Sequence, residues 1–553
     1  MGNRKVGGNS CRFWKKINSQ LLSEKKWAFI LIFFILLFNP VFYFWADNIN
    51  IKDKYLAWLI CIIVGFALSF INLFLKKRGE KIYLSILFAL SATPNIIVWT
   101  YLFISNTYMS QDMYWVIIDT NSSETAEYFN QFIPWQSLLT TLIYITLGIF
   151  LIVKTRSKQS ISLKKHWTWF SLSVIIVLSS IFLQYLAQAM PVVDFYRSNI
   201  MFLKERREFD KEKEIRKKQG IDVRCALPDS TNHLFVVVIG ESMSTCHISR
   251  YGYFRETTPV MDSLSGEFDV YTDVITPDTY TVGVMKKALS FADSSHPEYY
   301  TLKPSIIELF NTAGFETYWI SNQNFLDKWR GSHGAVAQQA KHIYNLAPLK
   351  QHDEILIPYL QEALHDSISG NKIIFVHLKG SHHTYNCRYP KDFDYFNCEK
   401  RGDLVAGFRN DYMKKTIDEY DNSIRYTDFV LGSIFRQIKD LNTSSCLLFF
   451  SDHGEEVYDT RTVGGHFMSN VHPCQCKIPF ILWRSEKYRE NVSDLVIDIS
   501  RPYSIEDVIY SLSTLCCLEY EGNNPARSIF SAEYKIPSKR MVGKENYENI
   551  LKK

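Results

Sequence analysis

Five long apolar runs in the first third of the chain place the strongest constraint on its fold. They cover residues 27–46, 55–75, 82–105 (with Pro94 inside), 133–153 and 167–189. Each has about the 20 residues that a helix needs to cross the hydrocarbon of a bilayer. One such run is compatible with a buried helix of a soluble protein, but five predict a membrane domain over 27–190. No small-residue cleavage site follows the first run, so residues 1–26 are expected to remain as an uncleaved N-terminus.

The basic residues around these runs predict the orientation of the chain. Four lie within 76–81 and five within 154–165, whereas 106–132 has no Lys or Arg and four acidic residues. By the positive-inside rule, the N-terminus is cytoplasmic and everything after the fifth run lies outside. The net charge of +5 therefore fits membrane flanks, and no nucleic-acid partner is expected.

The cysteines agree with an outside location for the second part of the chain. Cys387 and Cys398 share one polar loop, and Cys474 and Cys476 share another. Pairs of cysteines in polar loops are typical of proteins in an oxidising compartment. The adjacent pair at 516–517 is expected to lie in the core without a bridge.

Three further segments follow from the pattern of the chain. The outside segment 106–132 is long for a connection, and its part 122–132 is predicted either as a helix on the membrane surface or as a plain loop. Residues 191–231 are predicted to be a linker, with a charged, solvated helix over 195–219. A soluble domain is predicted over 232–553.

The soluble domain has the pattern of an α/β fold. Apolar strands are predicted at 234–240, 317–321, 373–378, 446–450 and 479–483, and helices at 305–312, 354–369 and 415–441. Continuous apolar strands that alternate with helices predict a largely parallel sheet with helices on both faces.

Polar residues follow three of these strands at the point where each strand ends. Glu241 follows the first, His382 and His383 follow the third, and Asp452 and His453 follow the fourth. Because the carboxyl ends of parallel strands meet at one edge of the sheet, we expect these side chains to lie together. Carboxylates combined with imidazoles suit Zn²⁺ or Mn²⁺.

Two other histidines are candidates for the same edge, and a third is not. His466 follows two glycines, and His472 lies close behind it. His377 lies within the third strand, so we expect it to point into the core.

A transferase also needs a nucleophile that water cannot replace, and 276–284 offers one. A hydroxyl beside a divalent cation loses its proton more easily than a free hydroxyl. A helix is predicted to begin near Thr281, and its first amides would help to hold a phosphate. Spacing alone does not separate Thr279, Tyr280 and Thr281.

Several motifs in order resemble the membrane-bound phosphoethanolamine transferases of the sulfatase/alkaline-phosphatase superfamily. The family includes enzymes that modify lipid A or the lipopolysaccharide core, and the mobile colistin-resistance enzymes. The motifs are Gly240-Glu-Ser242, Ser249-Arg-Tyr-Gly-Tyr253, Arg255-Glu-Thr-Thr-Pro259, Tyr280-Thr281, Gly380-Ser-His382, Ser451-Asp-His-Gly-Glu455 and Gly465-His466. The resemblance implies five membrane helices followed by a periplasmic α/β/α catalytic domain of the sulfatase type.

The resemblance also assigns roles to residues of the site. It implies that Thr281 is the nucleophile, which becomes phosphoethanolamine-threonine. Glu241, Thr281, Asp452 and His453 match the ligands of one tight zinc ion. His382 and His466 match two histidines that bind the donor phosphate, a second zinc ion or the leaving-group proton.

Weaker matches concern the substrates. Thr120 and Glu124 match positions that line the lipid headgroup site in family members, and Lys379 and His383 are further substrate-binding candidates. The stretch 379–383 is more similar to the branch that acts on core sugars than to the lipid A branch.

The cysteines both match the family and depart from it. Cys387 and Cys398 resemble a family disulfide. Pro277 and Lys287, by contrast, stand where some members have two cysteines that bracket the nucleophile.

The predicted function is transfer of phosphoethanolamine from phosphatidylethanolamine to a lipopolysaccharide acceptor, either a lipid A phosphate or a core sugar. The predicted location is a bacterial inner membrane, and we expect a monomer. The main alternative is a glycerolphosphate transferase of the lipoteichoic-acid-synthase type, with Mn²⁺ and phosphatidylglycerol. A sulfatase would need a Cys or Ser in a formylglycine context, which the sequence lacks, and a non-catalytic receptor would not need the whole set of residues.

Overall fold

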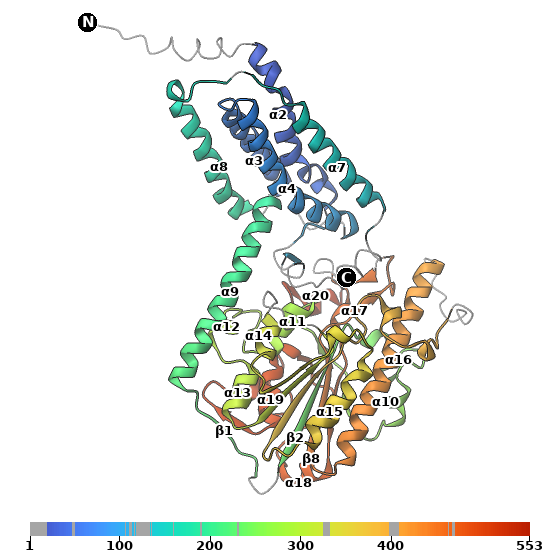
Figure 1. Ribbon diagram of the computed structural model, residues 1–553. Coiled ribbons are helices and arrows are strands. Elements are labelled where there is room, and N and C mark those ends of the chain that lie inside the picture. Colours follow the sequence, from blue (N-terminus) through green and yellow to red (C-terminus); the bar gives the residue numbers. More distant parts are fainter. Residues whose placement is uncertain are drawn as a thin grey trace. The chain divides into compact units, whose positions relative to one another are not determined.

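The computed structural model shows two compact units (Figure 1). It describes residues 19–552 except 47–49, 106, 110–112, 115–116, 118–132, 134, 159, 188–190, 229–231, 324–331, 398–408, 463 and 467–470. The described residues up to Met201 form the first, helical unit, and those from Phe202 onward form the second, the α/β unit.

The helical unit contains the predicted apolar segments as helices. They are α2 (Ser19–Leu37), α3 (Ile51–Asn72), α4 (Lys77–Ser105), α7 (Trp135–Lys154) and α8 (Trp167–Ala187), and a short 3₁₀ helix, η1 (Pro40–Trp45), follows α2. Pro94 lies inside α4, which continues through it.

Among the described residues, four helical stretches are long and apolar enough to cross a membrane, where the sequence predicts five. The difference lies in α8, whose described apolar stretch covers only Trp167–Ile181. Helix α8 as a whole has 21 residues, but its side chains beyond Ile181 are not described, so the described residues support four of the five predicted spans by this measure.

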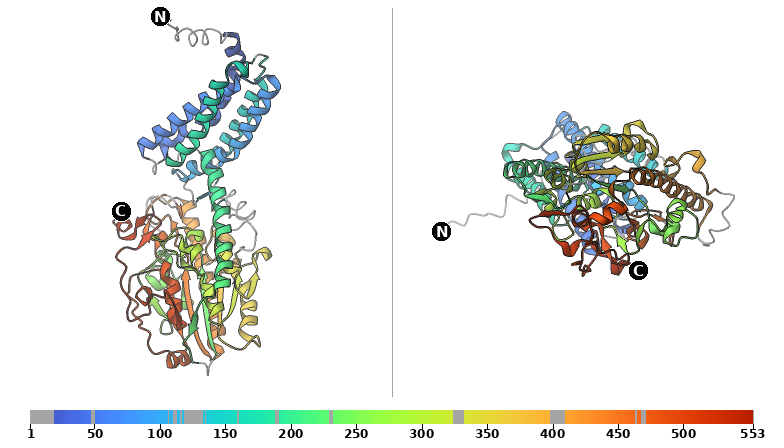
Figure 2. Two further views of the ribbon diagram at one scale, coloured as in Figure 1. Left: turned by 90° about the vertical axis from the view of Figure 1, so that its left-hand side faces the viewer. Right: turned by 90° about the horizontal axis from the view of Figure 1, so that it is seen from below.

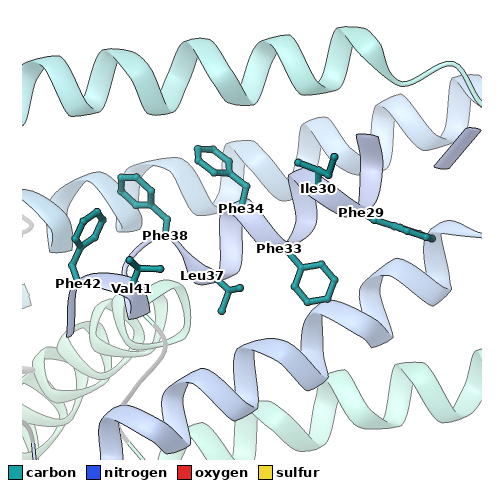
Figure 3. Close-up of a pocket in the computed structure, with 8 residues that line it drawn as sticks. All are labelled: Phe29, Ile30, Phe33, Phe34, Leu37, Phe38, Val41 and Phe42. Atoms are coloured by element: carbon teal, nitrogen blue, oxygen red, sulfur yellow. The ribbon is translucent and has the colours of Figure 1, made fainter. Parts of the chain in front are cut away.

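The outer surface of the helical unit is apolar. Phe66 is 66% exposed, Leu142 62% and Leu178 60%. An apolar groove of about 570 Å³ runs along α2 and η1, and every lining residue that Figure 3 labels is Phe, Leu, Ile or Val. Apolar side chains exposed over several helices are typical of a surface that faces lipid.

Polar contacts inside the helical unit join its helices. The Nζ of Lys25 on α2 donates to Oε1 of Glu80 on α4 at 3.0 Å, and both side chains are fully buried. The Nδ2 of Asn95 donates to the Tyr144 hydroxyl on α7 at 2.9 Å and to the Ile35 carbonyl on α2 at 2.9 Å. Buried polar groups that find partners in this way hold membrane helices in register.

Helix α9 (Pro191–Gln219) runs from the first unit into the second (Figure 2). Its second half is not the solvated linker that the charge pattern predicts. Phe209 is 1% exposed and stacks on Tyr300 with ring centroids 4.9 Å apart. Arg216 forms two hydrogen bonds with Glu308, at 3.1 and 3.0 Å. This half of α9 is therefore packed onto the α/β unit.

The α/β unit is built on a seven-stranded sheet of order β3-β11-β8-β2-β7-β5-β6. The strands are β2 (His233–Gly240), β3 (Asp269–Tyr271), β5 (Glu316–Ser321), β6 (His342–Asn345), β7 (Lys372–His377), β8 (Ser444–Ser451) and β11 (Phe480–Arg484). β2 is parallel to β7 and β8. β11 alone runs opposite to the other strands of this sheet, so it is antiparallel to both of its neighbours, β3 and β8. The predicted, largely parallel sheet is confirmed.

Helices cover both faces of this sheet. The residues of β2 alternate between two apolar clusters, because successive side chains of a strand point to opposite faces. One face is covered by α11 (Thr281–Ala288), α13 (Ile306–Thr312), α14 (Ser332–Ala337) and α19 (Val508–Leu515). The other is covered by α10 (Pro259–Ser263), α15 (Leu356–His365) and α16 (Asp411–Asp440). The architecture is thus α/β/α.

Short elements complete the unit. They are the strands β1 (Val223–Cys225), β4 (Val274–Ile275), β9 (Glu456–Val457), β10 (Gly464–Gly465), β12 (Tyr503–Ser504), β13 (Leu518–Tyr520), β14 (Met541–Val542) and β15 (Glu545–Asn546), and the helices α12 (Tyr299–Leu302), α17 (Pro473–Cys476), α18 (Glu486–Asn491) and α20 (Tyr547–Ile550). The long helix α16 begins four residues before its predicted start, because the side chain of Asn410 caps it by accepting from the Met413 amide.

Candidate metal centre and active site

The ends of β2, β7 and β8 lie side by side, as the sequence predicts. Gly240 is paired with Ser451, and Ile239 with His377. The residues that follow each strand therefore start from the same edge of the sheet. This register brings Glu241, the loop after β7 and Asp452-His453 together.

Glu241, Asp452 and His453 form a buried cluster. The Nε2 of His453 lies 3.4 Å from Oε1 of Glu241 and 3.5 Å from Oδ2 of Asp452. All three side chains are at most 1% exposed. Among the described residues, Nε2 of His453 and Oδ2 of Asp452 have no hydrogen-bond partner. Buried polar atoms are rarely left without partners, so these two atoms indicate a binding site for a ligand or a metal ion.

The tautomer of His453 fits a metal ligand. Its Nδ1 lies 2.9 Å from the carbonyl oxygen of Gly454 and therefore carries the proton. In the neutral form that a metal ligand requires, the lone pair of Nε2 then faces the two carboxylates. An imidazole oriented by a hydrogen bond from its other nitrogen is the usual arrangement at metal sites.

The protonation of the cluster also favours a cation. Burial, followed by the charge of Glu241, raises the pKa of Asp452 to about 8. Burial opposes protonation of His453, but the charges of Asp452 and Glu241 raise its pKa to about 10. Two buried carboxylates repel one another, and a divalent cation between them removes that repulsion.

Thr281 is the hydroxyl that reaches this cluster. It is the first residue of α11, and its Oγ1 donates to Oε2 of Glu241 at 3.2 Å. The side chains of Thr279 and Tyr280 are buried in the segment before the helix. Of the three hydroxyl residues that the spacing does not separate, Thr281 is therefore the one whose side chain reaches the cluster.

Gln323 is part of the site, although no motif pointed to it. Its Nε2 donates to Oε2 of Glu241 at 2.9 Å and to the carbonyl of Leu378 at 2.8 Å. The available signal was its place two residues beyond the end of β5, at the same sheet edge. Gln323 orients the Glu241 carboxylate and ties it to the loop after β7.

Asp353 fixes that loop and was also missed. Its carboxylate accepts the amides of Lys379 and Gly380 at 2.9 and 2.8 Å. Gly380 has φ +50°, and an added Cβ would lie 2.8 Å from the carbonyl oxygen of Glu241. Only glycine therefore allows the backbone to come this close to Glu241.

The predicted histidines fall into two places. The ring of His466 hydrogen-bonds Oε2 of Glu455 through Nδ1 at 2.8 Å and stacks on His383 with centroids 4.8 Å apart. His383, Glu455 and His466 thus form a second group whose ligand atoms lie within 4.8 Å of one another. His382 lies instead on the Glu241 side, where its charge would act on that carboxylate.

Burial keeps the imidazoles after β7 neutral. It lowers the pKa of His382 well below its usual value and that of His383 to about 4. The pKa of Glu455 lies below its usual value, because the charge of His466 and the hydrogen bond from its ring oppose the effect of burial. The second group therefore pairs an ionised carboxylate with ring nitrogens.

The other candidates have different outcomes. His377 is buried and bonds Ser321 at 3.2 Å, as expected for a core residue. His472 contacts Glu456 at 2.6 Å and Thr460 at 2.9 Å. The side chain of Lys379 is half-buried beside His382. Thr120 and Glu124 lie outside the described residues, so their roles remain predictions.

One disulfide joins parts of the chain that are far apart. Cys474 bonds Cys246, 228 residues away, and Cys476, which shares its loop, is a buried free thiol. The bond links the segment after β2 to the segment beside Gly454. Cys387 is exposed and has no disulfide partner among the described residues, and Cys398 lies outside them, so their pairing stays a prediction.

The predicted resemblance can now be compared with known proteins. A family model described as sulfatase matches residues 233–516. Phosphoethanolamine transferase EptC of Escherichia coli (strain K12) is 28% identical, with 95% of this chain and 94% of that protein covered. Phosphoethanolamine transferase CptA of Salmonella typhimurium is 28% identical, with 84% and 85% covered. The crystal structure of the C-terminal periplasmic domain of EptC from Escherichia coli, in complex with Zn, is 31% identical with a TM-score of 0.57 and covers 60% of this chain and 96% of that one.

The chain belongs to the sulfatase family, in its phosphoethanolamine transferase branch. The resemblance carried by the sequence motifs is confirmed, as is the expectation of a transferase. The fold of this sulfatase-family protein also matches the integral membrane protein lipooligosaccharide phosphoethanolamine transferase A from Neisseria meningitidis. That structure has a TM-score of 0.64 and 18% identity, with 91% of this chain and 98% of that one covered.

Proposed function

We propose that this protein transfers phosphoethanolamine from phosphatidylethanolamine to a lipopolysaccharide acceptor through a covalent intermediate on Thr281. The observation that carries the proposal is the Thr281 hydroxyl directed at the buried cluster of Glu241, Asp452 and His453. The relatives named phosphoethanolamine transferase, which match along nearly the whole chain, give the reaction class.

The residues of this cluster fit zinc. Glu241, Asp452 and His453 offer two carboxylates and one correctly oriented imidazole, and Thr281 offers a hydroxyl beside them. Zinc held there would make the Thr281 proton easier to remove and would offset negative charge on the phosphoryl oxygens. The zinc-bound EptC domain from Escherichia coli supports this choice of metal over Mn²⁺.

In the first step, Oγ of Thr281 attacks the phosphorus of phosphatidylethanolamine. Glu241 accepts the hydrogen bond of this hydroxyl, so it orients the oxygen for attack and takes up the proton that the oxygen loses. The bond between phosphorus and the diacylglycerol oxygen breaks, and that oxygen takes up a proton. The product is phosphoethanolamine esterified to Thr281.

His466 is the better candidate to supply the proton. The neighbouring rings of His382 and His383 are kept neutral by burial, because it lowers the pKa of both. His466 is partly exposed and has the ionised carboxylate of Glu455 beside it, which orients the ring and offsets positive charge on it. The sequence prediction left His382 and His466 as equal candidates for the proton donor, and this choice favours His466.

In the second step, an acceptor oxygen attacks the same phosphorus and the Thr281 oxygen leaves. A phosphate acceptor on lipid A would give a diphosphate link, and a core sugar hydroxyl would give a phosphodiester. The similarity of 379–383 to the branch that acts on core sugars favours the sugar. The added amine lowers the negative charge of the cell envelope, which would weaken the attraction of cationic peptides.

The proposed location is a bacterial inner membrane, with the N-terminus in the cytoplasm and the α/β unit in the periplasm. The charge pattern of the loops supports this orientation. The disulfide between Cys246 and Cys474 also fits the periplasm, because disulfides persist in oxidising compartments.

Peptide mass spectrometry tests the proposal. The full chain is incubated in detergent with phosphatidylethanolamine and no acceptor, so that the intermediate accumulates. We expect an added mass of about 123 Da on the Thr281 peptide, absent from Thr281→Ala. A glycerolphosphate adduct from phosphatidylglycerol would favour the alternative transferase. Unmodified Thr281 during consumption of the lipid would exclude the covalent mechanism.

A further inference from the structure

The last turn of α11 carries two lysines with different partners. Lys286 pairs with Glu205 on α9. Lys287 turns back towards the segment that precedes the helix. Its Nζ donates to the carbonyl of Pro277 at 3.0 Å and to Oδ2 of Asp278 at 3.4 Å. The Lys287 side chain is 14% exposed, so water screens these contacts only weakly.

The contacts of Lys287 close a loop around Thr281. The bond to Pro277 joins residues that are ten positions apart, and Thr281 lies between them. Helix α11 has only eight residues, and the side chain of its N-cap residue, Tyr280, makes no capping hydrogen bond. A helix this short without a cap is not stable by itself, so the position of its first residue depends on other contacts.

The segment held by Lys287 is itself anchored to the domain. The carbonyl of Pro277 also accepts the amide of Gly543 at 2.9 Å, and the amide of Thr276 donates to the Cys476 carbonyl at 2.9 Å. Lys287 thus connects the end of α11 to a fixed point of the α/β unit. Without it, the described contacts at the start of α11 include no side-chain cap to keep Thr281 in place.

We propose that Lys287 is a positioning residue that holds Thr281 against Glu241 by clamping α11 to Pro277 and Asp278. The inference rests on the proposed role of Thr281 as nucleophile. Positions 277 and 287 are those at which the sequence resemblance places a disulfide in some members. Here a hydrogen bond and an ion pair join the same two parts of the chain.

The test compares Lys287→Met with Lys286→Met in the full chain in detergent, with phosphatidylethanolamine as donor. Both variants lose one charge from the same helix turn, but only Lys287 contacts the nucleophile segment. We expect kcat of Lys287→Met to fall about 100-fold with KM unchanged, because a nucleophile displaced by about 1 Å loses that much rate. Lys286→Met is expected to stay within about 3-fold of the parent, because the contacts described for Lys286 are the pair with Glu205 and the Tyr300 ring 5.4 Å from its Nζ, and neither involves residues 277–281.

A double-mutant cycle separates a shared clamp from general destabilisation. Asp278→Asn removes the charge that faces Lys287. If the two residues act through one contact, the double variant is no slower than the slower single variant. If instead the two single substitutions lower kcat by factors that multiply in the double variant, the proposed clamp is overturned. Thermal unfolding of each variant shows whether a lower kcat is accompanied by a lower stability of the fold.

The outcomes also separate this inference from the proposed function. A fully active Thr281→Ala would overturn the proposed function, whatever Lys287 does. An inactive Thr281→Ala beside a Lys287→Met of normal kcat would overturn only the role of Lys287. The yield of the Thr281 adduct gives a second readout, and we expect its rate of formation to fall in parallel with kcat.

Discussion

Two buried charge clusters, one in each unit of the molecule, differ in how far their hydrogen bonds are satisfied. In the helical unit, the Nζ of Lys25 donates to Glu80 and to the carbonyls of Asn72 and Leu75. Glu80 also accepts from the Asn72 side chain and from the Ser157 amide. At the sheet edge of the α/β unit, Oδ2 of Asp452 and Nε2 of His453 have no hydrogen-bond partner among the described residues.

This difference separates a structural role from a binding role. A buried ion pair with all its hydrogen bonds satisfied stabilises the arrangement of the helices around it. A buried cluster with unsatisfied atoms costs free energy until a ligand completes it, and such clusters are typical of functional sites. Variants in the two clusters should therefore have opposite effects on stability and activity.

The largest effect is expected for Asp452→Asn. It removes one of two crowded carboxylates, so zinc binding and transfer activity are lost, with a fall in rate of at least about 10³-fold. The zinc-free protein is expected to melt at the same or a higher temperature, because the repulsion with Glu241 is gone. Metal analysis and thermal unfolding in detergent check both parts. A variant that keeps its zinc would contradict the assignment of the ligands.

Glu80→Gln is expected to have the opposite pattern. It leaves the buried ammonium of Lys25 without a countercharge, which costs about 3–5 kcal/mol of stability. Zinc content should stay at the parent level, because Glu80 lies in the other unit. Thermal unfolding in detergent measures the loss, and the double variant Lys25→Met/Glu80→Met should recover part of it. An unchanged melting temperature would show that the pair is not structural.

A third variant tests a satisfied charge cluster within the α/β unit itself. His247 lies between Asp421 at 2.6 Å and Asp459 at 2.9 Å. Burial opposes its protonation, but the charges of Asp459 and Asp421 raise its pKa from 6.5 to about 10. A raised pKa stabilises the fold fully below pH 6.5, and this contribution is lost as the pH rises towards 10.

We therefore expect His247→Gln to lose about 1.5–3 kcal/mol at pH 6, the range for a hydrogen bond to a charged group. The difference from the parent should shrink as the pH approaches 10. Melting temperatures across this pH range give the measurement. A difference that is constant with pH would mean that His247 is neutral in the folded protein.

The smallest effect is expected for Gln323→Leu. It removes the hydrogen bonds to Glu241 and Leu378 but keeps every predicted zinc ligand. Loss of a residue that orients a ligand typically costs about 10–100-fold in metal affinity or activity. Zinc titration should show a weaker site with the fold intact. Unchanged affinity would place Gln323 outside the metal centre.

The sequence predicted the elements that depend on local pattern. Apolar runs of about 20 residues predict membrane helices without any knowledge of their packing. The strands that end at Gly240 and Ser451 were visible as apolar runs, and parallel pairing brings their ends together. Glu241 and Asp452 could be found in this way because each directly follows a strand. The pattern narrowed the nucleophile only to residues 279–281, and the contact with Glu241 was needed to select Thr281.

Contacts between distant loops could not be predicted in this way. Nothing in the local pattern pairs Cys246 with Cys474, or directs Gln323 to Glu241 and Lys287 to Pro277. His382 lies on the Glu241 side, whereas its neighbour His383 stacks on His466. This arrangement of two adjacent residues depends on the turn at Gly380.

The sequence by itself thus determined the two kinds of unit, the order of the strands and helices along the chain, and the residues that the sheet edge presents. Only the tertiary structure decided which loops meet at that edge and which buried charges are satisfied there. The physical reason is that periodicity and turn residues act over a few neighbouring positions. Partners that are up to 228 residues apart, in contrast, are chosen by the packing of the whole domain.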